Sequence, residues 1–220
     1  MACKNCDPET NYPGRVIEYR SIGNTICCAI CNKPIRYQGM SSVHKQNYGS
    51  DLWDQYFHTI CIAVASKSPC LSRHIGAILV RDHSIVSTGF NGPSRGIPHC
   101  GIDRYEKDDA LVDIPTNAFQ TLQMANTCPR KVLGYASGTH LELCPAQHAE
   151  ENAISNAARL GVSTIGTTLY MNCIVPCKNC FGTLINAGIV EIVVDDVKVY
   201  DKHTQYLIDN SNIKIRRFEL

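Results

Sequence analysis

The last third of the chain constrains the fold most strongly. Segments with the apolar period of a helix alternate there with segments that have the period of a strand, and glycines follow the helical segments. The predicted elements are a helix over 146–160, a strand over 167–173, a helix over 177–187, a strand over 189–194, a short helix over 203–209 and a strand over 213–218. Gly161 and Gly188 follow the first two helices, and glycine commonly ends a helix because it tolerates positive φ. Helix, strand, helix and strand at these lengths predict a right-handed crossover. We therefore expect an α/β fold with a partly parallel sheet.

Upstream of this region, the pattern predicts one helix and one hairpin. Apolar residues recur at helical spacing from Trp53 to Val64, as on the buried face of an amphipathic helix. Two β-rich runs, 75–80 and 84–90, are joined by a short polar turn and predict a hairpin. Residues 91–145 show little period, and so long a loop in a compact domain is usually functional or an insertion.

The composition changes near residue 50. The 220 residues are enough for one catalytic domain and a short appendage. Residues 1–50 are rich in Gly, Pro, Asn, Ser and Cys without a sustained period, which indicates a small unit held by metal rather than by a core. We expect a small N-terminal unit over 1–50 and the main domain over 51–220.

Charge and cysteine content limit the partners and the compartment. The 21 Lys and Arg nearly balance the 20 Asp and Glu, so no overall basic field is available to hold a long nucleic acid. The first residues lack the apolar stretch of a secretory signal or a membrane anchor. The 13 cysteines are then expected to stay reduced in the cytoplasm and to bind metal rather than form disulfides. We expect no membrane association.

The residues that carry chemistry are His148 and Glu150, followed after one strand by Pro176, Cys177 and Cys180. A Cys-x-x-Cys pair at the start of a helix places two sulfurs about one turn apart, where the helix dipole favours thiolates. His148 supplies a third ligand, which leaves one tetrahedral position open, as in catalytic zinc sites. His-x-Glu followed by Pro-Cys-x-x-Cys is the signature of zinc nucleobase deaminases.

Glu150 is the predicted proton shuttle of this site. Zinc lowers the pKa of a bound water to roughly 7, and a carboxylate two residues beyond a ligand can take that proton and pass it to the departing amine. A lone Cys-x-x-Cys is often a structural zinc knuckle, and a lone His-x-Glu is usually surface. Their occurrence in this order, each at the start of its own predicted helix, favours the catalytic interpretation.

The sequence resembles the deoxycytidylate (dCMP) deaminases of bacteria and their viruses, most densely over 68–80, 87–100 and 140–144. The resemblance implies a three-layer α/β/α cytidine deaminase-like fold with a five-stranded mixed sheet, and zinc-dependent hydrolysis of dCMP to dUMP and ammonia. It also implies a homo-oligomer, commonly a hexamer, and regulation by dCTP and dTTP.

The resemblance suggests substrate residues as well. Ser68 and Arg73 are expected to bind the phosphate, for which a guanidinium is well suited. Asn91 is expected to bind a sugar hydroxyl through its amide. A helix cap, a solvated charge and an ordinary Asn-Gly turn are the structural alternatives for these three residues.

Nucleotide effectors would use a partly overlapping set. The segment Gly89-Phe-Asn-Gly92 matches a family element that contacts nucleoside triphosphates in regulated members, although the family usually has Tyr where this chain has Phe90. Arg159, eleven residues beyond His148, matches a position linked to the same regulation. The predicted allosteric residues are Gly89, Asn91, Gly92 and Arg159.

The resemblance also implies a second, structural zinc. Cys70, Cys100 and His140 fall where some phage and bacterial members hold this ion, with Cys144 as the expected fourth ligand and His99 as its competitor. Such a site would pin the long segment 91–145 against the domain. The alternative is that these thiols are scattered and buried.

The N-terminal cysteines form two further pairs, Cys3 with Cys6 and Cys28 with Cys31. Their arrangement is similar to the four-cysteine zinc-ribbon spacing, although slightly wide of it. Four ligands leave no open position, so this extension is interpreted as a structural zinc site. The whole chain is thus expected to hold one catalytic zinc and one or two structural zincs.

Three other functions share parts of this pattern. A tRNA- or single-stranded-DNA-editing deaminase would use the zinc ribbon to bind the strand, but the near-neutral charge and the lack of a basic, aromatic-laced groove pattern disfavour it. A zinc scaffold without activity is disfavoured by the presence of Glu150. Deaminases of free cytidine or guanine are disfavoured by the monophosphate-type match between Ser68 and Cys100.

Overall fold

The computed structural model describes residues 19–22, 25–28, 50–136, 138–199 and 201–220, with side chains from residue 52 onward. The chain separates into two units, Met1–Asn47 and Tyr48–Leu220. In the first unit, strand β1 (Tyr19–Ile22) pairs antiparallel with β2 (Thr25–Cys28), so this region contains a short hairpin. Cys3, Cys6 and Cys31 lie outside the described residues, as does the side chain of Cys28, and the N-terminal zinc site stays a prediction.

The second unit is built on a five-stranded mixed sheet. Its strands are β3 (Gly76–Arg81), β4 (Ser84–Phe90), β7 (Thr168–Ile174), β8 (Glu191–Asp196) and β9 (Lys214–Arg217), in the order β4-β3-β7-β8-β9. β3 runs antiparallel to both of its neighbours, whereas β7, β8 and β9 are mutually parallel. The predicted hairpin and the predicted parallel crossover are both confirmed.

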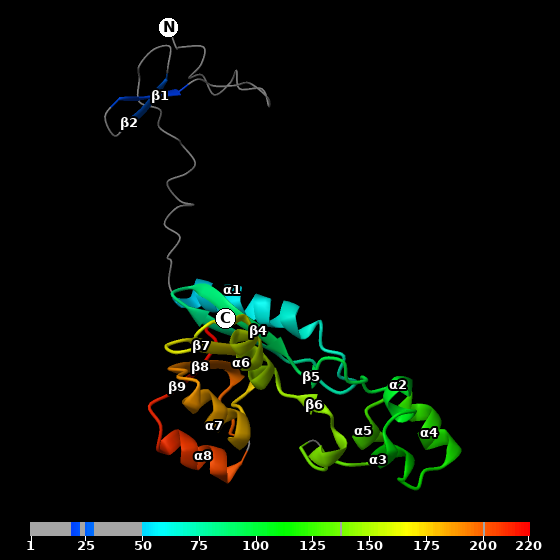
Figure 1. Cartoon of the computed structure of the whole chain (residues 1–220). Coiled ribbons are helices and arrows are strands. Elements are labelled where there is room, and N and C mark those ends of the chain that lie inside the picture. Colours follow the sequence, from blue (N-terminus) through cyan, green and yellow to red (C-terminus); the bar gives the residue numbers. More distant parts are fainter. Residues whose placement is uncertain (1–18, 23–24, 29–49, 137, 200) are drawn as a thin grey trace. The chain divides into compact units, whose positions relative to one another are not determined.

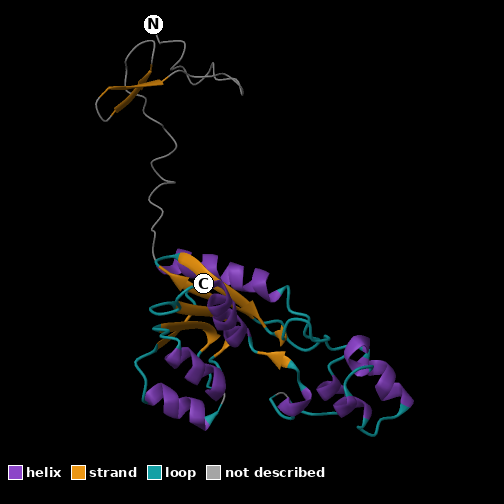
Figure 2. Ribbon diagram, in the orientation of Figure 1, coloured by secondary structure: helices purple, strands orange, loops and turns teal. Residues whose placement is uncertain are grey.

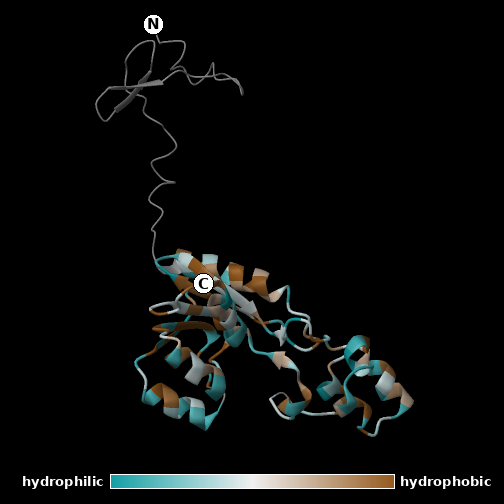
Figure 3. Cartoon of the chain, viewed as in Figure 1, coloured by the Kyte–Doolittle hydropathy of each residue, from teal (hydrophilic) through white to brown (hydrophobic). Residues whose placement is uncertain are grey.

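Helices cover both faces of this sheet, which makes three layers (Figures 1 and 2). On one face lies α1 (Ser50–Ala65); on the other lie α6 (Ala149–Leu160), α7 (Lys178–Asn186) and α8 (Lys202–Asp209). Polar and apolar stretches follow one another along α1 (Figure 3), as expected when one face of a helix is apolar and the other polar. No helix in the described part of the chain is long and apolar enough to cross a bilayer.

The alternation of side chains along β3 supplies both cores. Ile78 and Val80 pack with Phe57 and Cys61 of α1. Ala77 and Leu79 point to the opposite face and pack in the cluster that contains α6 and α7. A strand that is apolar on both faces is typical of a sheet covered on both sides.

The segment between β4 and α6 is not an irregular loop, as its weak period suggested. Strands β5 (Gly92–Pro93) and β6 (Ala146–Gln147) pair at its two ends, and between them lie four short α-helices and one 3₁₀ turn, η2 (Leu141–Leu143). The helices are α2 (Ile102–Tyr105), α3 (Asp109–Val112), α4 (Ala118–Met124) and α5 (Pro129–Val132). They gather beside β5 and β6, away from the main sheet (Figure 1). Helices of four to seven residues are too short to display a period, which is why the sequence did not reveal them.

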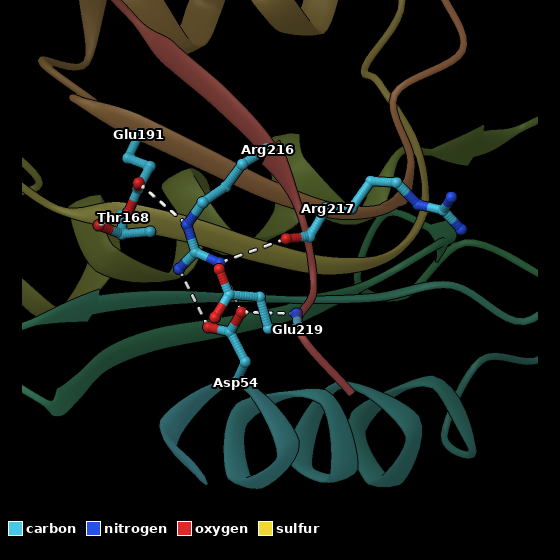
Figure 4. A network of polar contacts seen from close by, with 6 residues as sticks. All are labelled: Asp54, Thr168, Glu191, Arg216, Arg217 and Glu219. Atoms are coloured by element: carbon cyan, nitrogen blue, oxygen red, sulfur yellow. Dashed lines mark hydrogen bonds and ion pairs between the residues drawn. The ribbon is translucent and has the colours of Figure 1, made fainter. Parts of the chain in front are cut away.

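A polar network ties the C-terminal strand to the first helix of the domain (Figure 4). Arg216 of β9 donates to both carboxylate oxygens of Asp54 on α1, at 2.5 and 3.0 Å, and to Glu191 of β8 at 3.1 Å. The backbone N–H of Glu219 also donates to Asp54, at 2.9 Å. Asp54 is only 1% exposed, so these hydrogen bonds satisfy a buried charge.

Candidate active site

Three potential metal ligands meet where the first turns of α6 and α7 face each other. His148 is the N-cap residue of α6, Cys177 is the N-cap residue of α7, and Cys180 lies in the first turn of α7. His148 Nδ1 lies 3.2 Å from Cys180 Sγ and 3.6 Å from Cys177 Sγ, and the two sulfurs are 3.6 Å apart. Among the residues that the structure describes, this is the one group of three or more ligand atoms close enough to share an ion.

These separations fit a tetrahedral zinc ion. With Zn–S near 2.3 Å and Zn–N near 2.0 Å, two sulfurs of a tetrahedron lie about 3.8 Å apart, and a sulfur and a nitrogen about 3.5 Å apart. The observed distances are close to these values. One imidazole and two thiolates form a donor set that zinc favours, and three protein ligands are the number found in catalytic sites.

The local electrostatics favour a thiolate at Cys177. The hydrogen bond between the Cys177 and Cys180 sulfurs and the one with His148 lower the pKa of Cys177 to about 4, against the cost of burial. The hydrogen bond with Cys177 in turn raises the pKa of His148 to about 9. The hydrogen bond with Cys177 and burial raise the pKa of Cys180. A metal ion that binds His148, Cys177 and Cys180 would displace the protons that these side chains hold.

Glu150 stands beside this cluster without belonging to it. It lies in the first turn of α6, is 4% exposed, and is not among the clustered ligand atoms. Burial raises the pKa of its carboxyl group, an effect that the neighbouring His148 partly offsets. A carboxyl group with raised proton affinity is suited to accept and return a proton.

Two of the ligands, His148 and Cys177, line a cavity of about 390 Å³ together with Glu150. Its wall from the sheet domain includes Arg73, Asn91, His148, Glu150 and Cys177. Its wall from the inserted segment includes Cys128, Arg130, Lys131, Tyr135 and Leu141. The volume falls within the range of pockets that enclose small molecules.

Two of the three predicted substrate residues lie on the cavity wall. Arg73 and Asn91 line it, and the Asn91 amide also braces the backbone by accepting from Ile75 N at 2.8 Å and donating to Arg73 O at 2.9 Å. Ser68 does not line the cavity: it is buried, and its hydroxyl donates to Asn91 O at 2.6 Å. Ser72, which the sequence did not single out, lines the wall instead.

The residues predicted to bind effectors do not gather around this cavity. Gly89 lies beneath α6, where an added Cβ would come within 2.2 Å of Ala153 N. Gly92 lies in β5 against the ring of Pro69. Arg159 is exposed in the last turn of α6 and does not line the cavity, so of this set only Asn91 does.

The structure does not bring together the ligands predicted for a second zinc. Cys70 and Cys144 line the cavity, while Cys100 accepts a hydrogen bond from Arg104 at 3.5 Å. His140 stacks on Tyr135 and pairs with Glu142. No three of Cys70, Cys100, His140 and Cys144, all of them described, form a group of ligand atoms within 4.8 Å, and His99 joins none. This site stays a prediction.

The cavity residues that sequence reasoning missed come mainly from the insertion. Arg130, Lys131 and Tyr135 lie in or directly after α5, in the segment that showed little period. Their residue types are suited to ligand binding, but nothing in their spacing indicated that they face His148. Only the folding of the insertion places them there.

Comparisons with known proteins agree with this geometry. Residues 51–195 match the family model described as the cytidine and deoxycytidylate deaminase zinc-binding region. The deoxycytidylate deaminase of Mycobacterium phage D29 is 31% identical over 148 residues, which cover 64% of this chain and 92% of the phage protein. That of Schizosaccharomyces pombe is 28% identical over 167 residues, which cover 76% of this chain and 44% of the yeast protein. The chain thus spans less than half the length of this relative and of the Saccharomyces cerevisiae one, at 45%.

The fold is also that of a solved structure, the dCMP deaminase of cyanophage S-TIM5 in apo form. The two chains superpose with a TM-score of 0.50 at 18% identity, over 74% of this chain and 95% of the phage chain. The three layers, a sheet with parallel β7, β8 and β9 between helices on both faces, therefore form a cytidine deaminase-like fold. On the match over 51–195, which includes the metal cluster and Glu150, the chain belongs to the zinc-binding cytidine and deoxycytidylate deaminase family.

Proposed function

We propose that this protein catalyses the zinc-dependent hydrolytic deamination of dCMP to dUMP and ammonia. The observation that carries the proposal is the placement of Glu150, buried and raised in pKa, on the same cavity wall as a three-ligand zinc cluster. A closed, four-ligand structural site would have no use for such a carboxyl group. The names of the phage and yeast relatives support the substrate.

The reaction replaces the exocyclic C4–N4 bond of cytosine by a bond to a water oxygen. His148, Cys177 and Cys180 would hold the zinc, which when bound supplies a Lewis acid that makes water acidic near neutral pH. The Glu150 carboxylate takes the two protons of the attacking water in turn and delivers one to ring N3 and one to the N4 amine, which leaves as ammonia, so that the product has C4=O and N3–H. Burial of Glu150 excludes solvent that would otherwise compete for these protons.

The cavity supports a mononucleotide as the substrate. Arg73 offers a cation for the phosphate. The Asn91 amide is bonded to the backbone of Ile75 and Arg73, and its second N–H is the proposed donor to the sugar. A cavity of about 390 Å³ suits a small molecule, whereas a strand of tRNA or DNA needs a long basic groove. Control by dCTP and dTTP and assembly into a homo-oligomer stay predictions of the family resemblance.

A substrate panel tests the proposal. The full-length protein is incubated with cytidine, deoxycytidine, CMP, dCMP and a short cytosine-containing single-stranded oligonucleotide, and both the loss of cytosine absorbance and the release of ammonia are followed. We expect kcat/KM to be highest for dCMP. Salt-sensitive binding and faster turnover of the oligonucleotide would instead identify an editing deaminase, and no turnover of dCMP would overturn the proposal.

A further inference from the structure

The inserted segment between β5 and β6 forms one wall of the cavity that holds Glu150. This wall includes Arg130 and Lys131 of α5, together with Tyr135 just after it. Since β5 and β6 pair with each other, the two ends of the insertion are fixed beside the cluster of His148, Cys177 and Cys180. The insertion therefore contributes side chains to the cavity wall.

The cavity wall carries an excess of positive side chains. Arg73, Arg130 and Lys131 are its arginines and lysine, whereas Glu150 is the one carboxylate among the described residues that line it. A concave surface with this charge balance concentrates small anions.

Arg130 is the cavity cation with a buried nitrogen that lacks a partner. Its Nε is buried and has no hydrogen-bond partner, and among the described residues it is the one such buried side-chain nitrogen or oxygen. Its Nη2 reaches only Ala136 O, at 3.5 Å, which is the outer limit of a hydrogen bond. A hydrogen bond from the backbone of Glu142 and one with His140 at 2.8 Å lower the pKa of the Glu142 carboxyl group, and Arg130 adds only a smaller effect, so this carboxylate is engaged elsewhere.

A buried guanidinium N–H without a partner is unfavourable, so this group is poised for a ligand that accepts hydrogen bonds. A phosphate suits it best, because a guanidinium can donate two parallel hydrogen bonds to phosphate oxygens. Arg104, the buried arginine of the same insertion, shows the contrast. It donates to Asp108 at 2.7 Å and to Leu143 O at 2.7 Å, and is therefore already satisfied within the protein.

We infer that Arg130 is a specificity-determining residue that binds the 5′-phosphate of the substrate from the side of the insertion, in the cavity that Arg73 also lines. The inference rests on the proposed function for the identity of the nucleotide. It assigns to the insertion the discrimination between a nucleoside monophosphate and the free nucleoside. The chemistry at Glu150 is left unchanged.

Binding and turnover of matched ligand pairs test this role. Affinities for dUMP and deoxyuridine, which differ only in the phosphate, are measured by calorimetry, and kcat/KM is measured for dCMP and deoxycytidine. We expect Arg130→Gln to weaken dUMP binding and to lower kcat/KM for dCMP by about 10- to 100-fold, since hydrogen bonds to charged groups are worth this much. Both nucleoside values should stay at wild-type levels, and Arg130→Lys should restore part of the loss.

Lys107→Gln is the control, because Lys107 is an exposed cation of the same insertion that does not line the cavity. Equal losses on nucleotide and nucleoside, or no loss on either, would overturn the role of Arg130. So would a wild-type protein that shows no preference for the phosphate. If wild type binds dUMP in an Arg130-dependent manner but does not deaminate dCMP, the proposed function fails while the anion site stands.

Discussion

At the scale of single residues, the site depends on His148 and Glu150, two residues at the start of α6 with different proposed roles. His148 is the N-cap residue, so its imidazole points out of the helix start toward the sulfurs of α7. Glu150 is the second residue of α6 and is buried, and its carboxyl group does not belong to the ligand cluster. Two positions along the chain thus separate the proposed metal ligand from the proposed proton shuttle.

The metal cluster predicts a specific loss of zinc. Cys177→Ala removes one of the three ligands, and two remaining ligands cannot hold zinc against a chelator, so metal analysis should find one zinc equivalent fewer per chain than in wild type. The control is Cys173→Ala, because Cys173 lines the cavity without joining the cluster. An unchanged zinc content in Cys177→Ala, or an equal loss in Cys173→Ala, would contradict the ligand assignment.

The sequence predicted the cluster but not the whole cavity, for a physical reason. The spacing of Cys177 and Cys180 places both sulfurs on one helical turn, so local geometry alone encodes two ligands. Ser72 and Arg130 reach the cavity only through the folding of distant segments, and no local period announces their positions. The assignment of Ser68 to the phosphate shows the same limit, since its hydroxyl is engaged with Asn91 O.

At the scale of elements, the position of α6 depends on how closely it approaches β4. An added Cβ at Gly89 would lie 2.2 Å from Ala153 N and 2.3 Å from Ala149 O, both of them backbone atoms of the helix. The strand and the helix that begins with His148 can therefore pack only because residue 89 has no side chain. This contact gives Gly89 a structural explanation that is independent of any effector.

We predict that Gly89→Ala destabilises the protein, because α6 must shift away from the sheet. Overpacking of this kind costs about 1–3 kcal/mol in the free energy of unfolding, measured by denaturant titration. Gly182→Ala is the matched control: it lies in α7 with nothing within 4 Å of the added Cβ, and should be neutral or stabilising by up to about 1 kcal/mol. A neutral Gly89→Ala would show that the packing is looser than described.

Elements with strong periods were predictable, and those stabilised by tertiary contacts were not. The sheet strands and α1, α6, α7 and α8 fall within a few residues of the predicted ranges, since each has a full apolar face or an end signal such as Gly161 at φ 69°. The short helices of the insertion depend on local caps, such as the reciprocal hydrogen bonds of Asn117 and Gln120, and on single buried residues such as Met124. Such features carry too little pattern to be recognised in advance.

At the scale of the whole molecule, the domain is closed by contacts between its first helix and its last strand. Asp54 and Arg216 are 162 positions apart and form a two-pronged ion pair, which Glu191 extends to the neighbouring strand (Figure 4). Asp54 and Glu191 raise the pKa of Arg216, so the guanidinium stays charged throughout the pH range in which the protein folds. The edge strand β9 is thereby fixed to the sheet.

Loss of this ion pair should destabilise the whole domain. Asp54→Ala leaves Arg216 with Glu191 and some solvent, so the cost should lie somewhat below the roughly 3–5 kcal/mol of breaking a fully buried pair. Asp195→Ala is the comparison, because its pair with His58 is half-exposed and should be worth about 1 kcal/mol or less. Equal effects of the two substitutions on the unfolding midpoint would mean that the buried network has no special weight.

We propose that the Glu150 carboxyl group, beside a three-ligand zinc site, drives the deamination of dCMP. The most direct test measures zinc content and dCMP turnover in wild type and in Glu150→Gln, which keeps the size of the side chain but cannot carry a proton. We expect equal zinc in both proteins and a loss of kcat of at least about 100-fold in the variant, in line with removal of a general acid–base group. Wild-type turnover in zinc-loaded Glu150→Gln would contradict it.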